Sequence, residues 1–210
     1  MKLSLKKKHQ KNYHHGDLAQ ALVDTSEQLI LEKGVEAFSL REAARLVGVD
    51  PSACYRHYKD KNAILKALAK KGFTAMAQSM NEDLKKKAHA STEEKIETLC
   101  LGYFHFADKA PALFRVMFGQ LGVDSRDASL KGHYENDLGP YDILIQVVTA
   151  WSTEKKFKKN PQETALELWA AIHGLTCLAM DGAVQAELSS KDKTRKAIAS
   201  LAKTMMRGLS

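Results

Sequence analysis

Apolar positions recur along most of the chain with the spacing of a helix. Between Leu40 and Val47 they fall at i, i+3, i+4 and i+7, which is the pattern of a helix with one buried face. Similar spacing predicts further helices over residues 17–33, 51–58, 63–87, 92–108, 112–118, 141–151, 162–188 and 194–206. No stretch alternates apolar and polar residues as a half-buried strand does. The sequence therefore predicts an all-α protein of about nine helices.

Residue types at the helix ends predict how the chain turns. Two serine–glutamate pairs three residues apart predict capping boxes at helix starts, Ser39 with Glu42 and Ser91 with Glu94. Gly48 is expected to end the helix over 40–47, because glycine readily adopts the left-handed conformation of a C-terminal stop. Asp50 and Pro51 then restart the chain as an N-cap and a first helical residue. The stretch is predicted to form a helix, a tight turn and a second helix.

The second of these helices, predicted over 51–58, carries an unusual set of outward side chains. Cys54 and Tyr58 are four residues apart and can both face the interior. The remaining positions around the outside are Ser52, Ala53, Tyr55, Arg56 and His57. Small residues followed by a tyrosine, an arginine and a histidine suit a helix that enters the major groove of DNA end-first.

The stretch 13–73 resembles the DNA-binding domain of the TetR family of transcriptional regulators. The resemblance rests on G-D-L near the start of the first helix, E-K-G-V-E-A-F-S-L-R-E-A-A before and into the second, and Y-R-H-Y-K-D-K after the turn. It implies a three-helix DNA-binding domain over 13–73, preceded by a basic arm over 1–12. Residues 74–210 are then expected to form a helical domain for effector binding and dimerisation. Two departures from the family's usual pattern are Cys54, where a larger aliphatic residue is common, and Arg56, where an aromatic is frequent.

The resemblance and the residue chemistry together assign roles on DNA. The candidates for contacts to base edges are Ser52, Ala53 and Arg56, since arginine to guanine is the commonest specific contact. The candidates for phosphate contacts are Tyr55, His57 and Lys61, together with Ser39 and Arg41 at the start of the preceding helix. The resemblance implies a homodimer that binds double-stranded DNA at a palindromic operator, as a repressor released by a small-molecule effector. An activator or a nucleoid-associated binder is the alternative.

Residues 166–182 contain W-x-x-x-H-G, which resembles the C-terminal domain of the TetR branch named for its Trp-His-Gly residues. Trp169 and His173 are four apart and share a helix face. His173 is either a hydrogen-bonded core or interface histidine or a ligand contact. Small residues nearby would let a second helix approach closely, as in the family's dimer bundle. The expected dimer interface comprises Trp169, Ala170, Gly174, Leu201 and Met205.

Aromatic and methionine side chains of the C-terminal part have two interpretations. They are either ordinary core residues or the lining of an adaptable ligand cavity, which the family possesses. The residues assigned to this cavity are Tyr103, Phe104, Met117, Phe118, Tyr141, Trp151, His173, Cys177 and Met180. The expected effector is apolar or amphipathic.

Composition narrows the class of protein further. The chain has 210 residues, with 32 Lys+Arg against 25 Asp+Glu and a formal charge of +7, which favours a polyanionic partner. The three cysteines show no paired spacing, so neither a disulfide framework nor a zinc site is expected, and a reducing cytoplasm fits best. The basic arm over 1–12 is either a solvated tail or a segment that follows DNA phosphates.

Several classes of function are not expected. The apolar stretches are too short and too polar to span a membrane, and no secretory signal follows the basic start. The sequence implies no metal and no cofactor. Cys100, His105, Asp108 and His173 could be combined into a notional catalytic set, but none lies in a nucleophile elbow, a metal-ligand spacing or a phosphate loop. The protein is therefore not expected to be an enzyme.

Overall fold

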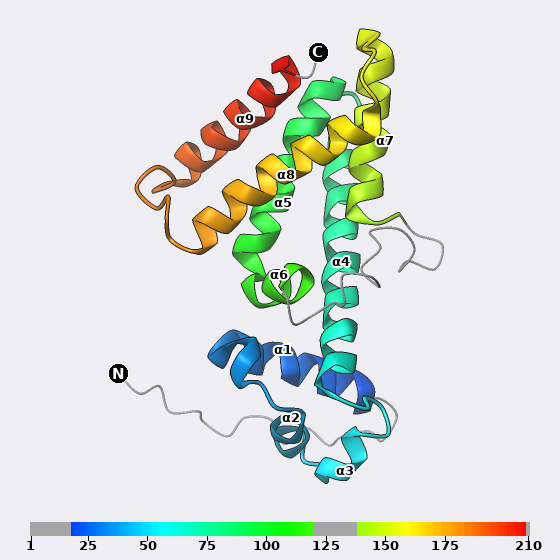
Figure 1. Cartoon of the computed structure of the whole chain (residues 1–210), viewed down its shortest axis with the longest axis vertical. Helices are drawn as coiled ribbons and strands as arrows, with labels where there is room; N and C mark the ends of the chain where they lie inside the picture. Colours follow the sequence, from blue (N-terminus) through cyan, green and yellow to red (C-terminus); the bar gives the residue numbers. More distant parts are fainter. Residues whose placement is uncertain (1–17, 120–137, 209–210) are drawn as a thin grey trace. The chain divides into compact units, whose positions relative to one another are not determined.

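The computed structural model describes residues 18–119 and 138–208, and these residues form helices without strands (Figure 1). The helices are α1 Leu18–Ala37, α2 Leu40–Val47, α3 Pro51–Cys54, α4 Lys61–Lys86, α5 Thr92–Lys109, α6 Pro111–Phe118, α7 Pro140–Lys155, α8 Pro161–Met180 and α9 Lys191–Gly208. The prediction of an all-α fold is confirmed. The predicted basic arm over 1–12 lies outside the described residues.

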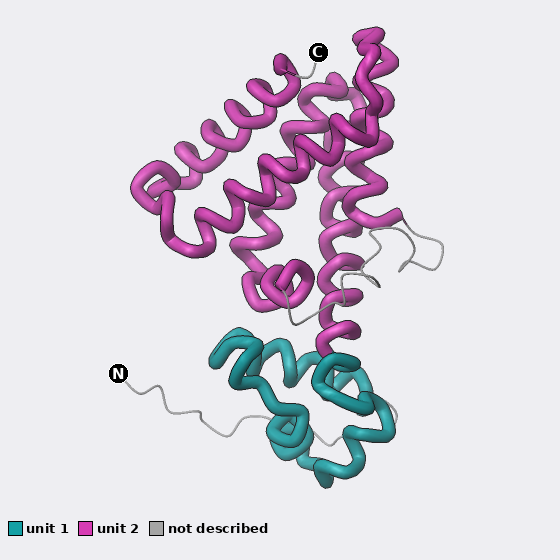
Figure 2. Tube along the Cα trace, in the orientation of Figure 1, with its two compact units in different colours: residues 1–64 teal, residues 65–210 magenta. Residues whose placement is uncertain are grey.

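The chain divides into two compact units, residues 1–64 and residues 65–210 (Figure 2). The division falls in the second turn of α4, so this helix begins in unit 1 and continues through unit 2. The domain boundary predicted at residue 73 lies further along the same helix. Each unit has its own set of buried apolar side chains.

In unit 1, α2 packs against α1 and α3. Its buried apolar residues are Leu22, Val23, Leu29, Ile30, Phe38, Leu40, Ala43, Ala44, Cys54 and Ile64. Gly34 has φ +82° and ψ 166°, so it interrupts the helical conformation near the end of α1, where a stop was predicted. Gly48 has φ +88° and ends α2, with the Val49 amide donating to the Ala44 carbonyl at 3.0 Å. This left-handed stop is the one that the sequence predicts.

Two local predictions in unit 1 are wrong. Ser39 is the N-cap of α2, but its side chain makes no capping hydrogen bond. Glu42 does not reach back to it, because its carboxylate pairs with the Lys33 ammonium at 2.6 Å. The helix predicted over 51–58 ends at Cys54, because the following amides bond three residues back, as His57 does to the Cys54 carbonyl at 3.0 Å. The segment 55–57 is therefore a tight turn.

In unit 2, α5 packs against α6, α7, α8 and α9 and is the central helix (Figure 1). Fully buried side chains from five helices meet in the core, among them Met76 of α4, Ile96 and Leu99 of α5, Ile143 and Val148 of α7, Leu168 of α8 and Ile198 of α9. None of the helices within 18–119 and 138–208 is both long and apolar enough to cross a membrane.

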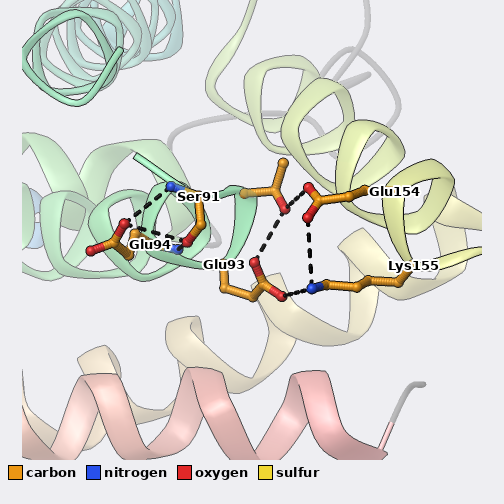
Figure 3. Close-up of polar contacts among 6 residues, drawn as sticks. Ser91, Glu93, Glu94, Glu154 and Lys155 are labelled. Carbon is orange, nitrogen blue, oxygen red and sulfur yellow. Dashed lines mark hydrogen bonds and ion pairs between the residues drawn. The ribbon is translucent and has the colours of Figure 1, made fainter. Parts of the chain in front are cut away.

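Most helix ends in unit 2 lie close to their predicted positions, with two exceptions. Helix α7 was predicted to end at residue 151 but continues to Lys155. The capping box of α5 is complete, since the Glu94 amide donates to Ser91 Oγ at 3.2 Å and the Ser91 amide donates to Glu94 Oε2 at 3.1 Å (Figure 3). The helix predicted over 162–188 stops at Met180, so its predicted length is wrong. Gly182 has φ +79°, and the Ala183 amide reaches back to the Leu178 carbonyl at 2.9 Å. A glycine in this conformation ends the helix before its hydrophobic pattern does.

Candidate nucleic-acid interface and aromatic cluster

The start of α3 is held by Asp50. Its Oδ1 accepts the Ser52 amide at 2.8 Å, and Pro51 occupies the first helical position. Hydrogen bonds from the Ser52 side chain and amide hold the pKa of Asp50 below its ordinary value, so this carboxylate stays charged. The first turn of α3 is therefore fixed by a cap within its own sequence.

Cys54 and Tyr58 anchor the other side of the segment. Cys54 is 0% exposed and its thiol donates to the Pro51 carbonyl at 2.7 Å. Burial raises the pKa of the Cys54 thiol, which keeps it protonated and unreactive. The Tyr58 hydroxyl donates to the Ala19 carbonyl of α1 at 3.4 Å. Cys54 is therefore buried in the core of unit 1, and Tyr58 ties the segment to α1.

The predicted DNA contacts of this segment face outward. Ser52, Arg56 and His57 are exposed, Tyr55 is 44% exposed, and Ala53 is half-buried. We call these five residues the reading surface. Two further candidates come from α2 and its N-cap, where Arg41 is exposed and Ser39 is half-buried. The reading surface can donate hydrogen bonds to base edges and phosphates, because it carries a hydroxyl, a phenol, a guanidinium and an imidazole on a short, capped helix and the turn after it.

Lys61 is the candidate whose surroundings the sequence did not reveal. Its ammonium donates to the Glu36 carbonyl at 3.0 Å and lies 5.8 Å from the centre of the Phe38 ring. The first turn of α4 is thus joined to the last turn of α1 and to Phe38, which follows α1. An ammonium has three donors, so this contact leaves donors for a phosphate.

A cluster of aromatic rings surrounds His173 in unit 2. His173 Nδ1 and the Tyr103 hydroxyl are 2.7 Å apart, and the ring packs 4.9 Å from Phe118 and 5.7 Å from Phe114. Cys177 Sγ lies 3.4 Å from His173 Nε2. Burial lowers the pKa of His173 and raises the pKa values of Tyr103 and Cys177, so all three groups favour their neutral forms. We call the rings of Tyr103, Phe114, Phe118, Tyr141, Trp169 and His173 the aromatic cluster.

The aromatic cluster contains part of the predicted cavity lining. Tyr103, Phe118, Tyr141, His173 and Cys177 come together there, and Phe73 joins them through Phe118 at 5.4 Å. Trp169, assigned to the dimer interface, is half-buried and contacts Tyr141 at 5.3 Å. Helical spacing of four between Trp169 and His173 was the signal that they share this face.

The other predicted lining residues lie elsewhere in unit 2. Met117 is 3% exposed and its side chain lies against Gly72 of α4. Phe104 and Met180 are half-buried against the core. Trp151 is separate from the aromatic cluster, since its ring contacts Phe157 at 4.7 Å and lines a hollow formed by α5, α7 and α9.

The outer face of α8 carries a row of exposed small and apolar residues. Ala170 and Gly174 were predicted at a dimer interface, and both are exposed. Leu166 and Leu178, which the prediction missed, are 51% and 50% exposed. All four are spaced four residues apart, so they form one line, which we call the α8 stripe. Leu201 and Met205 of α9 are half-buried against the core.

Metal ligation finds no support in the described residues. No group of three or more His, Cys, Asp or Glu side chains comes together there to hold a metal ion. The cysteines Cys54, Cys100 and Cys177 are free. Burial raises the pKa of Cys100 to about 12, which keeps its thiol protonated.

Comparisons with known proteins define the class. Residues 96–201 match the model of the tetracyclin repressor-like C-terminal domain, and residues 22–68 match the model of the tetR family of bacterial regulatory proteins. A comparison with curated proteins found no match. The chain belongs to the TetR family of transcriptional regulators, which are DNA-binding proteins and not enzymes.

Solved structures share the fold over nearly the whole chain. A protein of unknown function from Rhodococcus sp. RHA1 has a TM-score of 0.75 and 27% identity, covering 95% of this chain and 98% of its own. The transcriptional regulator FadR from Bacillus subtilis, solved in complex with stearoyl-CoA, has a TM-score of 0.65 and 19% identity, covering 91% and 100%. The fatty acid degradation regulator FadR from Bacillus halodurans has a TM-score of 0.68 and 14% identity, also covering 91% and 100%.

Proposed function

We propose that this protein is a ligand-released repressor that binds a palindromic operator as a homodimer. The observation that carries the proposal is the reading surface, whose polar side chains face outward from a capped turn of a TetR-type helix-turn-helix. The proposed domains are 13–73 for DNA binding, after the arm over 1–12, and 74–210 for effector binding and dimerisation. Its operators would be bound in the cytoplasm.

On DNA, Ser52, Ala53 and Arg56 read base edges, and Tyr55 and His57 hold phosphates. Arg56 is the principal reader, because a bidentate arginine–guanine contact contributes about 1–3 kcal/mol of discrimination. Further phosphate contacts come from Lys61, Ser39 and Arg41. Two such surfaces one helical turn apart on the same face of DNA recognise two half-sites related by the dimer axis.

The α8 stripe is the proposed centre of the dimer interface. Leu166 and Leu178 are each about half exposed, and the small residues Ala170 and Gly174 between them leave room for a second helix. Trp169, Leu201 and Met205 flank this face on α8 and α9. An isologous contact between two copies of the stripe gives the two-fold symmetry that a palindrome requires.

The proposed effector site is the aromatic cluster with its polar centre. Rings and apolar side chains favour an apolar or amphipathic molecule, and His173 and Tyr103 offer it hydrogen bonds. Cys177, whose Sγ lies 3.4 Å from His173 Nε2, completes the proposed lining. Stearoyl-CoA, the ligand of the Bacillus subtilis relative, is an amphipathic molecule of this class. Binding shifts the spacing of the two reading surfaces through α4, with a coupling free energy of about 1–3 kcal/mol.

Enrichment of fragmented genomic DNA by the purified protein, followed by sequencing, tests the proposal. The test variant is Tyr55→Ala with Arg56→Ala, because both side chains are exposed and their removal leaves the core of unit 1 intact. The matched control is Arg195→Ala, which removes an exposed cation from α9. We expect a shared palindrome in DNA enriched by the parent and the control but not by the double variant.

Enrichment without a common palindrome would refute a sequence-specific dimer and favour a nucleoid-type binder. Equal enrichment by the double variant would remove the reading surface as the recognition element. Arg56→Ala alone should relax the preference at one base pair in each half-site, and an unchanged preference would remove Arg56 as a reader.

A further inference from the structure

A cysteine beside the aromatic cluster meets a histidine that is itself held in place. Cys177 Sγ lies 3.4 Å from His173 Nε2, and the Tyr103 hydroxyl lies 2.7 Å from the other ring nitrogen, Nδ1. Cys177 and His173 are one turn apart on α8, and Tyr103 comes from α5. A nucleophile, a base and a group that orients the base are the three parts of an activated thiol.

These contacts decide which nitrogen of His173 can accept a proton. A neutral imidazole has one N–H donor and one acceptor nitrogen, and a thiol sulfur is a poor acceptor. The favourable arrangement therefore has the Cys177 thiol donating to Nε2 and the Nδ1–H donating to the Tyr103 oxygen. Burial lowers the pKa of His173, so the ring is uncharged at neutral pH and Nε2 can take the thiol proton.

The surroundings of Cys177 keep its thiol protonated at rest. Burial raises the pKa of the thiol, the Asp181 carboxylate raises it further, and the Arg115 guanidinium opposes both. Asp181 and Arg115 are 3.7 Å apart, so their charges largely offset each other at the sulfur. Because the thiolate is the reactive form of cysteine, such a thiol reacts slowly unless a base removes its proton as the new bond forms. His173 is the base in contact with it.

The other two cysteines of the chain are buried. Cys54 is 0% exposed, and Cys100 is 5% exposed with the pKa of its thiol raised by burial to about 12. Cys177 is half-buried beside Asp181 and Arg115, whose side chains are 70% and 59% exposed, so it lies near the surface of unit 2. Reactive cysteines occupy partly exposed positions, whereas fully buried ones are inert. The three thiols should therefore differ sharply in reactivity.

We propose that Cys177 is a site of covalent modification by apolar α,β-unsaturated carbonyl compounds. His173 Nε2 takes the thiol proton while the sulfur bonds to the β-carbon of the compound. The π electrons of the C=C bond move onto the carbonyl oxygen as an enolate, and the imidazolium then gives its proton to the α-carbon. An S–H bond and a C=C π bond break, an S–C bond and a C–H bond form, and no oxidant is consumed.

The neighbouring rings select the kind of compound. The Phe118 and Phe114 rings lie 4.9 Å and 5.7 Å from the His173 ring, so an aromatic or aliphatic substituent has apolar surface to pack against. The modification rests on the proposed effector site, since the compound must pack against the aromatic cluster to place its β-carbon at the sulfur. An effector of this class would then remain attached to the protein.

Mass spectrometry of the full chain, without DNA, measures the modification. The probe is N-phenylmaleimide, and N-phenylsuccinimide is its saturated counterpart without the reacting C=C bond. We expect one adduct on the parent with the first, none with the second, and none on Cys177→Ser. N-(2-hydroxyethyl)maleimide carries a polar substituent, so its rate relative to that with free N-acetylcysteine should be about ten-fold lower than for the phenyl probe.

The pH dependence and a matched pair of histidine variants test the base. Below its pKa a free thiol reacts about ten-fold faster per pH unit, because only the thiolate attacks. With His173 as the base, the parent rate should change less than about three-fold between about pH 7 and 8, where the ring is already uncharged. His173→Gln should react at least about ten-fold more slowly at about pH 7. The control His105→Gln, at an exposed position of α5, should match the parent.

Four results would overturn the assignment of Cys177 and His173. They are the absence of an adduct on Cys177, adducts on Cys54 or Cys100 at the same rate, equal rates for the parent and His173→Gln, and equal relative rates for the two maleimides. A parent rate that follows the pH dependence of a free thiol would do the same, and this measurement needs no variant to fold. Operator enrichment without the adduct would overturn this inference alone, and the adduct without operator enrichment would overturn the proposed repressor alone.

Discussion

The close approach of α4 and α6 at Gly72 gives a quantitative test of packing in unit 2. A Cβ atom added at Gly72 would lie 2.5 Å from Met117 Sδ and 2.8 Å from Met117 Cγ. Met117 is 3% exposed, so its side chain has little free space to move into. Because both contacts are shorter than 3.0 Å, Gly72→Ala should force a repacking whose cost lies in the upper part of the usual range, at about 2–3 kcal/mol. The gain in helix propensity from glycine to alanine offsets about 1 kcal/mol of this.

We expect Gly72→Ala to lower the free energy of unfolding by about 1–2 kcal/mol. Urea unfolding at one fixed protein concentration measures it, because the apparent stability of the proposed dimer would depend on concentration. Met117→Ala alone should cost about 2–5 kcal/mol, since it leaves a cavity in the core. In the double variant the new methyl group occupies part of that cavity, so the two losses should fall short of additivity by about 1–2 kcal/mol.

Two results would refute this reasoning. The first is a Gly72→Ala protein that is as stable as the parent, which would mean that α4 and α6 separate at no cost. The second is a double variant whose loss equals the sum of the single losses. Strict additivity would show that the added methyl group and the Met117 side chain do not compete for the same space.

Three further predictions concern the helix ends, the α8 stripe and the aromatic cluster. Among the described residues, Lys156 is the non-glycine residue with a positive φ (+58°), a left-handed conformation that glycine adopts at lower cost than lysine. Lys156→Gly should therefore raise the free energy of unfolding by about 0.5–1 kcal/mol, whereas the control Lys158→Gly should not. A Cβ atom added at Gly174 meets no atom of its own chain within 4 Å, so Gly174→Ala should leave the monomer folded. It should raise the dimer dissociation constant measured by sedimentation equilibrium. An unchanged dissociation constant would count against the α8 stripe as the dimer interface. The pKa of His173 is lower in the folded state than in the unfolded state, so the unfolded state binds more protons as pH falls below about 6.5. The free energy of unfolding should therefore decline over that range more steeply in the parent than in His173→Gln. Parallel pH profiles of the two proteins would contradict this.

Features that depend on neighbouring residues were predictable from the sequence. The Gly48 stop, the Asp50 cap, the helix start at Pro51 and the Ser91–Glu94 capping box all formed as expected. Each rests on hydrogen bonds or dihedral preferences that span no more than five residues, so no distant part of the chain is needed to decide them. The helical periodicity likewise identified the elements and their buried faces.

The predicted capping box at Ser39 did not form, because residues distant in sequence decide it. Ser39 and Glu42 have the same spacing as Ser91 and Glu94, yet only the second pair forms a capping box. In the first, the Glu42 carboxylate meets the Lys33 ammonium of α1 at 2.6 Å. Which partner a glutamate takes depends on what the fold brings within reach, and a charged partner competes well with a backbone amide.

The family and the all-α architecture were therefore determined by the sequence alone, because they follow from local patterns and a long motif. The tertiary structure decided which buried rings meet. Helical spacing indicates that Trp151 and Tyr103 both face inward, but it says nothing about their neighbours. The fold joins Tyr103 to His173, 70 residues away, at 2.7 Å, and it packs the Trp151 ring against Phe157. Contacts between helices depend on how the helices pack, and no repeat within one helix encodes that.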